Sequence, residues 1–403
     1  MAKSNAYEGQ STTAIHAGEQ PDPVTGASAP NLVMSSTYVA SEPAGFSAHD
    51  LGDDSPFLYG RWGNPTTRAL EQKLAALEGT ESCLCLASGM AAASAIFLTL
   101  LSAGDHVIVS DVSYAGVAEL ARDTLPRFGI AVSLVDCSDP ANVAAAMRPE
   151  TRLVHCETPV NPILRLTDLR AIAEIAHQGG AKLSCDSTFA SPIGLKSAAL
   201  GVDYVMHSIT KYIGGHGDAI GGAICGSRAD IAALNLEAAI HHGGVLSPFN
   251  AWLIARGAAT LPLRMRAHQD GALAVAQFLE QHPKVTRVMY PGLESHPQHA
   301  LAQQQMSNFG GMVSFQVGDE AAGDAVAARM AEELQVIHYA VSLGHHRSLV
   351  FWMPTAGLME TSFRLKGTAL ESYRAYAGDG IFRLSVGLED AGDLIADLAR
   401  VLD

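Results

Sequence analysis

Short apolar runs alternate with stretches of helical periodicity through the middle of the chain, and this alternation limits the possible folds more than any other feature. Near-continuous apolar strands separated by helices are typical of a mostly parallel α/β sheet that is covered on both faces. Ligands of such sheets bind at the carboxyl ends of the strands. The sequence predicts strands at 83–87, 106–110, 131–135, 152–156, 182–185, 204–207 and 219–225, and helices at 90–101, 117–128, 141–147 and 169–177.

The segments on either side of this alternation predict two further parts. Residues 1–58 are rich in Ser, Thr, Gly, Pro and Ala, which favours an N-terminal arm over an independent domain. A long helical segment from about residue 255 leads into a second, smaller α/β region with apolar runs at 311–317, 337–341 and 382–387. The predicted division is therefore an arm at 1–58, a large domain at 59–256 and a C-terminal small domain at 257–403.

Helical spacing and capping residues predict where two of the helices lie. The first is expected to begin with Thr66 or Thr67 as its cap and to end at Gly79. Its apolar face would consist of Leu70, Leu74 and Leu77. The second covers the 270s, where the apolar positions are predicted to be core residues: Ala272, Leu273, Val275, Ala276 and Leu279.

Composition excludes several classes of protein. The 403 residues include 26 Lys and Arg against 41 Asp and Glu, a net charge of −15. Phosphate binding needs a concentrated basic face, so nucleic acid is not an expected partner. The hydrophobic fraction of 48% excludes a disordered chain. The charged fraction of 17% is below the ~25% of typical domains, which indicates that other subunits cover part of the surface.

Cysteine usage and the absence of targeting signals indicate a cytoplasmic protein. Six cysteines are scattered without a CxxC pair, as expected for buried thiols in a reducing compartment. Cys83 and Cys85 would share one face of a strand, but further metal ligands are not evident. The adjacent pairs His241-His242 and His345-His346 do not have ligand spacing either, so no metal is expected. The first residues lack an apolar signal segment, and the run at 91–101 is too short to span a membrane.

One lysine and one aspartate follow apolar runs that read as buried strands. Taken alone, Asp186 would be a helix cap and Lys211 a solvated surface residue. Lys211, however, lies among small hydroxyl residues and glycines at the ligand-binding edge, where it is poorly solvated. Desolvation lowers the pKa of a lysine and frees its amine for Schiff-base chemistry. An aspartate at the end of a neighbouring strand would hold a pyridinium nitrogen protonated.

The segment Thr210-Lys211-Tyr212, with Gly215-His216 and Asp218, resembles the lysine signature of the Cys/Met-metabolism enzymes that use pyridoxal phosphate (PLP). This family includes methionine and cystathionine γ-lyases, cystathionine synthases and O-acylhomoserine sulfhydrylases. The resemblance implies the type I, aspartate aminotransferase-like fold and covers nearly the whole chain. Its other motifs are Thr13–His16, Ser36–Tyr38, Tyr59–Arg61, Asn64–Thr66, Ser88–Met90, Glu157–Pro162 and Arg383–Glu389.

The resemblance also implies a role for each cofactor residue. Lys211 would bind PLP covalently and then carry protons between Cα, Cβ and the leaving group, while Asp186 would pair with the pyridine nitrogen. Tyr114 would stack on the ring and assist the leaving group, and Asn161 would reach the ring oxygen. The phosphate would be held by Ser208, by Thr210 and by the start of an apolar helix at Ser88, Gly89 and Met90.

For the substrate, the resemblance implies an arginine anchor and an active site shared between subunits. Arg383 would hold the α-carboxylate through a bidentate pair, with Ser342 and Tyr114 as further substrate contacts. Tyr59 and Arg61 would reach the phosphate of the neighbouring subunit in a homotetramer built as a dimer of dimers. The alternative for Tyr59 and Arg61 is a surface turn with an aromatic anchor.

Three departures from the family pattern concern the substrate. Methionine γ-lyases typically carry a cysteine where this chain has Gly116, and many cystathionine-cleaving members carry a glutamate where it has Val341. His345-His346-Arg347 and the segment 351–380 also depart from the pattern, which raises canavanine, with its guanidinooxy leaving group, as a substrate. Candidate partners for a cationic leaving group are Tyr7, Glu8, Phe351 and Trp352.

The expected activity is γ-elimination from a γ-substituted L-amino acid of the methionine, homocysteine or canavanine type, which yields a 2-oxo acid and ammonia. The alternative is a γ-replacement transferase of the O-acylhomoserine sulfhydrylase or cystathionine γ-synthase type, in which sulfide or a thiol captures the same γ-carbon. A non-catalytic homologue is disfavoured because every cofactor position is filled.

Overall fold

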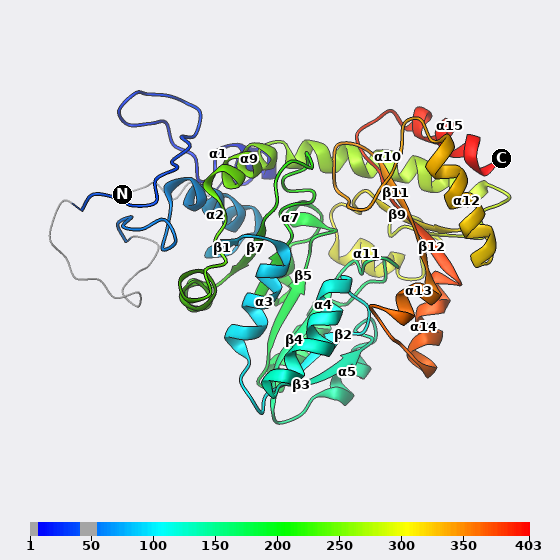
Figure 1. The fold of residues 1–403 in the computed structure, drawn as a ribbon, viewed down its shortest axis with the longest axis horizontal. Helices are drawn as coiled ribbons and strands as arrows, with labels where there is room; N and C mark the ends of the chain where they lie inside the picture. The colour runs from blue at the N-terminus through cyan, green and yellow to red at the C-terminus, as the bar shows by residue number, and fades with distance from the viewer. Residues whose placement is uncertain (1–6, 41–54) are drawn as a thin grey trace.

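The computed structural model describes residues 7–40 and 55–403 (Figure 1). Its larger part is built on a seven-stranded sheet. The strand order is β1-β7-β6-β5-β4-β2-β3. The strands are β1 (Ser82–Leu86), β2 (His106–Ser110), β3 (Ala131–Val135), β4 (Thr151–Glu157), β5 (Lys182–Asp186), β6 (Tyr204–His207) and β7 (Gly222–Gly226). Strand β7 is antiparallel to both of its neighbours, whereas the pairs among β2 to β6 are parallel. The predicted mostly parallel sheet is therefore confirmed.

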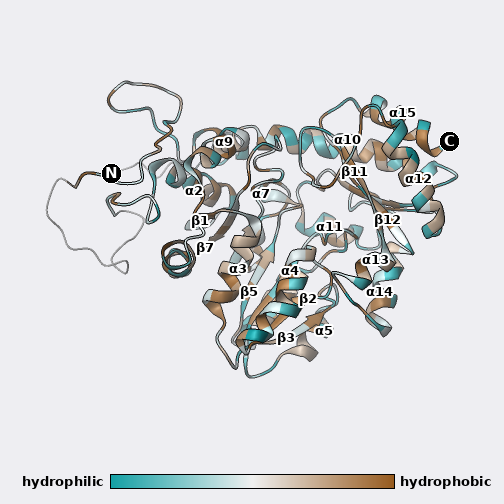
Figure 2. Cartoon of the chain, in the orientation of Figure 1, coloured by the Kyte–Doolittle hydropathy of each residue, from teal (hydrophilic) through white to brown (hydrophobic). Residues whose placement is uncertain are grey.

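Helices cover both faces of this sheet, as the alternation of the sequence predicts. The helices are α2 (Pro65–Glu78), α3 (Gly89–Leu100), α4 (Ala115–Glu119), α5 (Pro140–Ala146), α6 (Leu169–Gln178), α7 (Ser191–Gly194), α8 (Arg228–Leu234) and α9 (Pro248–Ala258). Alternate strand residues enter two separate cores: Ile108 packs on one face, and Val107 and Val109 on the other. Cys83 and Cys85 share one face, as predicted. Figure 2 shows hydrophobic residues along α3, which lies against β6 and β7.

Two details of the predicted helices differ. The cap of α2 is Asn64, whose side chain accepts from the N–H groups of Thr66 at 2.8 Å and Thr67 at 3.3 Å, and Pro65 occupies the first turn. The expected cap at Thr66 or Thr67 is wrong because these residues already lie inside the helix, whereas Gly79 ends it in the left-handed conformation at φ 83°. The helix expected at 117–128 is α4 followed by a π-helical turn at Leu120–Thr124 and a 3₁₀ turn at Leu125–Phe128.

The C-terminal part contains a second sheet of five strands in the order β10-β11-β12-β9-β8. Its strands are β8 (Arg287–Met289), β9 (Met312–Gln316), β10 (His338–Tyr339), β11 (Leu349–Pro354) and β12 (Gly380–Ser385). Its helices are α10 (Leu261–Gln281), α11 (His299–Gln305), α12 (Glu320–Glu333), α13 (Thr355–Glu360), α14 (Gly367–Ala377) and α15 (Ala391–Leu402). The predicted core positions of the 270s lie in its hydrophobic core or pack against it. The predicted division at 256 falls within α9 and stays a prediction.

Helix α10 connects the two parts: in Figure 1 it runs from the middle of the molecule towards α15. The N-terminal segment contains α1 (Gln10–His16), which packs against α2 and α10. Lys73 of α2 anchors it, with its ammonium 2.9 Å from Glu19 and donating to the carbonyl of Ile15 at 3.2 Å. The remainder of the predicted arm at 1–6 and 41–54 lies outside the described residues. Within 7–40 and 55–403, no helix is both long and apolar enough to cross a membrane.

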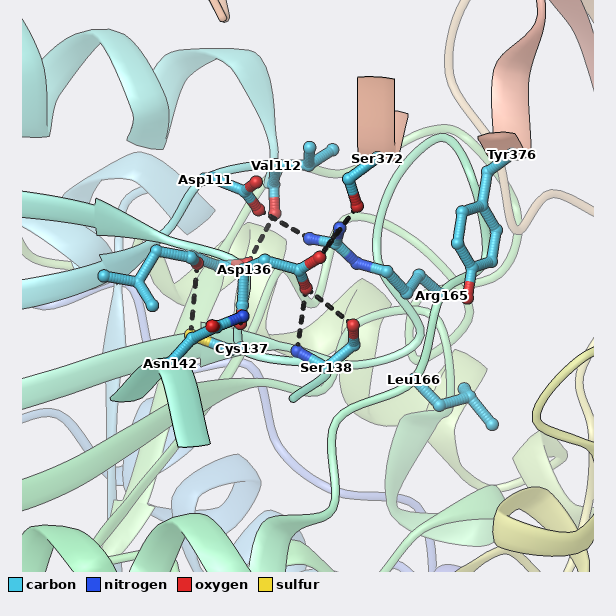
Figure 3. A network of polar contacts seen from close by, with 12 residues as sticks. Asp111, Val112, Asp136, Cys137, Ser138, Asn142, Arg165, Leu166, Ser372 and Tyr376 are labelled. Carbon is cyan, nitrogen blue, oxygen red and sulfur yellow. Dashed lines mark hydrogen bonds and ion pairs between the residues drawn. The ribbon is translucent and has the colours of Figure 1, made fainter. Parts of the chain in front are cut away.

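A buried ion network joins the large sheet to α14 (Figure 3). The Arg165 guanidinium lies between two carboxylates, 2.5 Å from Asp111 and 2.8 Å from Asp136. Ser372 of α14 donates at 2.9 Å to Oδ2 of Asp136, the same oxygen that faces Arg165. Because Asp111 directly follows β2 and Arg165 lies in the loop after β4, the network joins two loops that leave the carboxyl edge of the sheet.

Candidate active site

A cavity of about 480 Å³ lies where the carboxyl ends of β4, β5 and β6 face the smaller sheet. Eleven of its wall residues are residues that the sequence analysis predicts for the site, and all of them except Gly89 and Met90 have polar or charged side chains. These predicted residues are Ser88, Gly89, Met90, Tyr114, Asn161, Asp186, Ser208, Thr210, Lys211, Ser342 and Arg383. The structure therefore gathers them from segments that are almost 300 residues apart in sequence.

Lys211 and Asp186 occupy the centre of the cavity wall. Burial lowers the pKa of Lys211, the charge of Arg383 lowers it further, and the carboxylate of Asp186 opposes the shift. Asp186 is buried and accepts the N–H of Thr188 at 2.9 Å. Burial raises the pKa of Asp186, and the positive charges of His207 and Lys211 act in the opposite direction. A carboxylate in this position is well placed to bind a cationic ring nitrogen.

The start of α3 forms one end of the cavity and fits a phosphate group. Ser88 caps this twelve-residue helix by accepting the N–H of Ala91 at 3.1 Å. The N–H groups of a first helical turn have no acceptors within the helix, and the helix dipole favours an anion there. Ser208 approaches so closely that a Cβ on Gly89 would lie 2.9 Å from its Cβ. The Thr210 hydroxyl is 3.1 Å from the carbonyl and 3.0 Å from the N–H of Gly221.

Arg383, on β12, forms the opposite end of the cavity. Its guanidinium donates to Asn161 Oδ1 at 2.9 Å and to the Ser342 carbonyl at 3.3 Å. Its Nε is buried without a hydrogen-bond partner among the described residues. Since a guanidinium fork binds a carboxylate through two nitrogens, this arrangement fits an amino-acid carboxylate. The amide nitrogen of Asn161 stays available for the ring oxygen that the sequence assigns to it.

Glu157 is a site residue that the sequence analysis quoted only as part of a motif. It ends β4 beside Asp186, which ends β5 in the same register. Its two carboxylate oxygens accept the N–H of Tyr114 at 2.6 Å and the N–H of Asn161 at 2.7 Å. Burial and the neighbouring Asp186 raise the pKa of Glu157. The signal for it was a charged residue at the end of a buried apolar strand.

Arg264 of α10 was not predicted, yet it holds the loop that carries Lys211. Its buried guanidinium donates to the carbonyls of Tyr212 at 2.6 Å, Ile213 at 3.2 Å and Gly257 at 2.7 Å. A Cβ on Gly215 would lie 2.1 Å from this guanidinium, so only glycine permits the contact. The sequence carried no signal for Arg264, because these three partners are backbone carbonyls and two of them are about fifty residues away.

Tyr59 and Arg61 do not line the cavity of their own chain. The Arg61 guanidinium carbon lies 5.5 Å from the centre of the Tyr59 ring, and Arg61 donates to the carbonyl of Ile240. The Tyr59 side chain is exposed, with 43% of its surface accessible. Their predicted contact with the phosphate of a neighbouring subunit therefore stays a prediction.

Of the four candidate partners for a cationic leaving group, only Phe351 lines the cavity. The prediction for Trp352 is wrong, because its ring packs against Phe382 in the core of the smaller sheet. Its Nε1 donates to Asp324 at 2.8 Å. Tyr7 packs against His16, with ring centres 5.7 Å apart, and Glu8 is exposed, so neither of them is part of the cavity wall.

Comparison with known proteins identifies what this chain resembles. The family model described as "Cys/Met metabolism PLP-dependent enzyme" matches residues 11–403. A canavanine γ-lyase of Pseudomonas canavaninivorans is 41% identical over 97% of this chain and 96% of its own. A cystathionine γ-synthase of Mycobacterium tuberculosis is also 41% identical, over 98% and 97%. The crystal structure of metB from Corynebacterium glutamicum superposes with a TM-score of 0.88 at 35% identity, and 98% of each chain is covered.

Proposed function

The chain belongs to the Cys/Met-metabolism family of PLP-dependent enzymes, and from this premise we propose that it catalyses γ-elimination from a γ-substituted L-amino acid. The products would be a 2-oxo acid, ammonia and the released γ-substituent. PLP is the cofactor of this family, and the fold is the type I fold of its solved members. The observation that carries the proposal is a lysine with a lowered pKa in one cavity with Asp186 and Arg383.

The residues of the cavity would hold PLP by both of its ends. Ser88, Gly89, Met90, Ser208 and Thr210 form the phosphate end, and Asp186 would bind the ring nitrogen. Tyr114 would stack on the ring. When bound, PLP withdraws electrons from the α-carbon of an amino acid and so makes its proton removable.

Lys211 would move the protons of the reaction. Since burial lowers its pKa, a larger share of its amine is neutral at physiological pH than that of an exposed lysine. The neutral amine accepts the Cα proton and then acts at Cβ, and the γ-substituent leaves with the electrons of its bond. Tyr114 donates a proton to the leaving group, and the γ-carbon takes up a proton before the product is hydrolysed.

Elimination and replacement differ in what reaches the γ-carbon. Replacement of the cystathionine type requires a second amino acid, which brings an ammonium and a carboxylate into the cavity. In the described part of the chain, the charged residues of the cavity wall are Glu157, Asp186, Lys211 and Arg383. Each of them faces PLP, the first substrate or backbone donors, which supports elimination. Sulfide carries no second charged group, so an O-acylhomoserine sulfhydrylase is the alternative.

The active site is proposed to be shared between two subunits of a homotetramer. Tyr59, which is exposed, and Arg61, which is half-buried, lie outside the cavity of their own chain on one turn, where a partner's phosphate site could meet them. Phosphate binding then needs the basic Arg61 from a second copy.

The decisive experiment separates the two reactions by their products. Purified holoenzyme is given methionine, homocysteine, cystathionine, O-acetylhomoserine and canavanine one at a time, with and without sulfide. Elimination predicts equal amounts of ammonia and 2-oxobutanoate from a single substrate without sulfide. A thioether or thiol product that forms only when sulfide is present would replace the proposal by its alternative. No product from any substrate, in a preparation shown to bind PLP, would overturn both.

A further inference from the structure

We propose that the cavity selects substrates whose γ-substituent is uncharged and apolar, and that Phe351 is the residue that selects them. This inference rests on the proposed function, because it names the class of leaving group that the same cavity accepts. It is carried by the register of the smaller sheet, by the composition of one cavity wall and by the positions of the charged side chains.

The pairing of β11 with β12 decides which aromatic side chain enters the cavity. Phe351 lies directly opposite Arg383 in this antiparallel pair, and Met353 lies opposite Ile381. Opposite residues share a face and successive residues alternate between faces. Phe351 and Met353 therefore project on the side of Arg383, while Trp352 projects into the core on the other side, as its contact with Phe382 requires.

Six apolar residues of the segment 341–363, Phe351 among them, line the cavity and are called the apolar wall here. The elements after β11 contribute Leu358 from α13 and Phe363 from the segment before α14. Phe363 is 2% exposed, and its ring centre lies 5.7 Å from that of Tyr373, so this part of the wall is fixed by its own core. The apolar residues that face the cavity on this side are Val341, Leu343, Phe351, Met353, Leu358 and Phe363.

Among residues 7–40 and 55–403, the charged side chains that line the cavity lie in the rest of its wall. Glu157 binds two backbone N–H groups, Asp186 faces Lys211, and Arg383 is the carboxylate anchor. An ammonium or guanidinium in contact with the apolar wall would lose part of its water without gaining a carboxylate, so a substituent of this kind binds more weakly than an alkyl group. An alkyl group in the same place gains about fourfold in affinity for each buried methylene.

Asp218, which lies beside the cavity, is the alternative partner for a cationic substituent that the experiment tests. Asp218 is exposed and lines an open hollow of about 410 Å³, together with Asn250 and His345. This hollow shares Thr210, Ile220 and Ser342 with the cavity. A long cationic side chain that passes the rim would meet Asp218 instead of the apolar wall.

The inference is tested with amino acids that bind but carry no leaving group. We would measure by calorimetry the Kd of 2-aminobutyrate, norvaline, norleucine and lysine for the PLP-loaded protein. The first three differ by one methylene each, and lysine adds a terminal ammonium to the norleucine chain. We expect affinity to rise about fourfold per methylene and lysine to bind at least tenfold more weakly than norleucine.

Variants test whether the apolar wall causes the gain in affinity per methylene. Phe351→Ala should reduce the gain per methylene to about twofold or less, because the ring that covers the chain is gone. Trp352→Phe is the matched control on the same strand and should leave the gain unchanged. Should Phe351→Ala not fold, Val341→Glu serves in its place, because Val341 is 63% exposed and tolerates a charge. It should tighten lysine at least fivefold without tightening norleucine.

Two binding results would overturn the inference: lysine that binds as tightly as norleucine, and an affinity that does not rise along the methylene series. If lysine does bind tightly, the variants locate its ammonium. Loss of that binding in Phe351→Ala would show a cation over the aromatic ring, and loss in Asp218→Asn would place the cation in the hollow. The failure of this inference can be told apart from the failure of the proposed function. Preferred cleavage of canavanine would contradict the inference alone. An affinity that rises steeply with each methylene, without formation of 2-oxobutanoate from any substrate, would contradict elimination alone.

Discussion

Glu157 shows how a single buried carboxylate can position two active-site residues at once. Both of its oxygens accept backbone N–H groups, from the residue that would stack on PLP and from the residue that binds Arg383. A carboxylate is the only side chain of this length that offers two acceptor oxygens and no donor. We infer that Glu157 is a positioning residue for Tyr114 and Asn161.

Replacing Glu157 by glutamine tests this role. The amide keeps one acceptor oxygen but places its NH₂ against the other N–H, so one buried donor loses its partner at a cost of about 1–3 kcal/mol. We expect Glu157→Gln to lower kcat at least tenfold. Glu389→Gln is the control, since Glu389 also accepts two hydrogen bonds, from Ser348, but lies outside the cavity wall. Similar losses of activity in both variants would reject a specific role.

Single residues also show what the sequence could and could not predict. Nine of the eleven predicted cavity residues meet because they end or follow strands of the large sheet whose carboxyl ends share one edge, whereas Ser342 and Arg383 come from the second sheet. The choice between Phe351 and Trp352 needed the register of β11, since a shift by one residue exchanges the two faces. Gly116 is explained by packing: a Cβ there would lie 2.9 Å from the Tyr114 ring and 3.0 Å from the sulfur of Met90.

At the scale of elements, α10 supports the lysine loop from beneath. Arg264 gathers three carbonyls of buried backbone, which a lysine cannot do because it lacks the guanidinium fork. Burial lowers the pKa of Arg264 to about 10, so it stays protonated at neutral pH.

We therefore expect Arg264→Lys to weaken the binding of PLP at least fivefold and to lower the free energy of unfolding by about 2–4 kcal/mol. PLP titration and denaturant unfolding measure the two effects. Arg266→Lys, at an exposed position on the same helix, is the control and should change neither. Unchanged PLP affinity in Arg264→Lys would show that the loop keeps its shape without the fork.

The network of Figure 3 makes a second prediction for elements. Removing the cation in Arg165→Met leaves Asp111 and Asp136 close together without a counterion, and breaking such a buried pair typically costs about 3–5 kcal/mol. Restoring neutrality in the triple variant Arg165→Met, Asp111→Asn, Asp136→Asn should recover part of that loss in denaturant unfolding. An Arg165→Met variant as stable as the parent would contradict the network's contribution.

The elements that the sequence missed have physical reasons. Strand β8 has three residues and begins with an exposed arginine, so it shows no apolar run. Strand β11 is an apolar run that was assigned to the unusual segment instead of to a sheet. The cap of α2, Asn64, lies before the predicted threonines because proline is favoured at the first helical position, so that the residue before it is the cap.

For the whole molecule, buried histidines predict how stability depends on pH. Burial lowers the pKa of His155, His268 and His296 to about 4 each. The unfolded chain, in which histidine titrates near 6.5, binds these protons more strongly, so stability falls as pH drops from about 6.5 to 4. Glu157 and Asp111, whose pKa values are raised, act in the opposite direction.

A variant isolates the histidine contribution. His155→Asn should make the decline in unfolding free energy between pH 6.5 and 4 shallower by up to about 1.4 kcal/mol per pH unit. Denaturant unfolding at several pH values in this window provides the comparison with the parent protein. Parallel curves for the two proteins would show that His155 does not take part.

The shared active site is also a property of the whole assembly. We expect Tyr59→Ala and Lys211→Ala proteins each to be inactive, and their mixture to regain up to about a quarter of the parent activity, because hybrid dimers contain one intact site. Mass spectrometry confirms that subunits exchange. Exchange without recovered activity would remove Tyr59 from the partner's site.

The central claim, elimination at the γ-carbon, is tested most directly by running the reaction with methionine in D₂O. The departing methylthio group leaves a γ-carbon that must take up a proton from the medium, whereas carbon-bound hydrogens of a methyl group do not exchange in water. The account predicts 2-oxobutanoate with one deuterium at C4, in addition to deuterium at C3, and no C4 deuterium when Lys211→Ala replaces the parent. Product without deuterium at C4, or product that retains the sulfur, would contradict it.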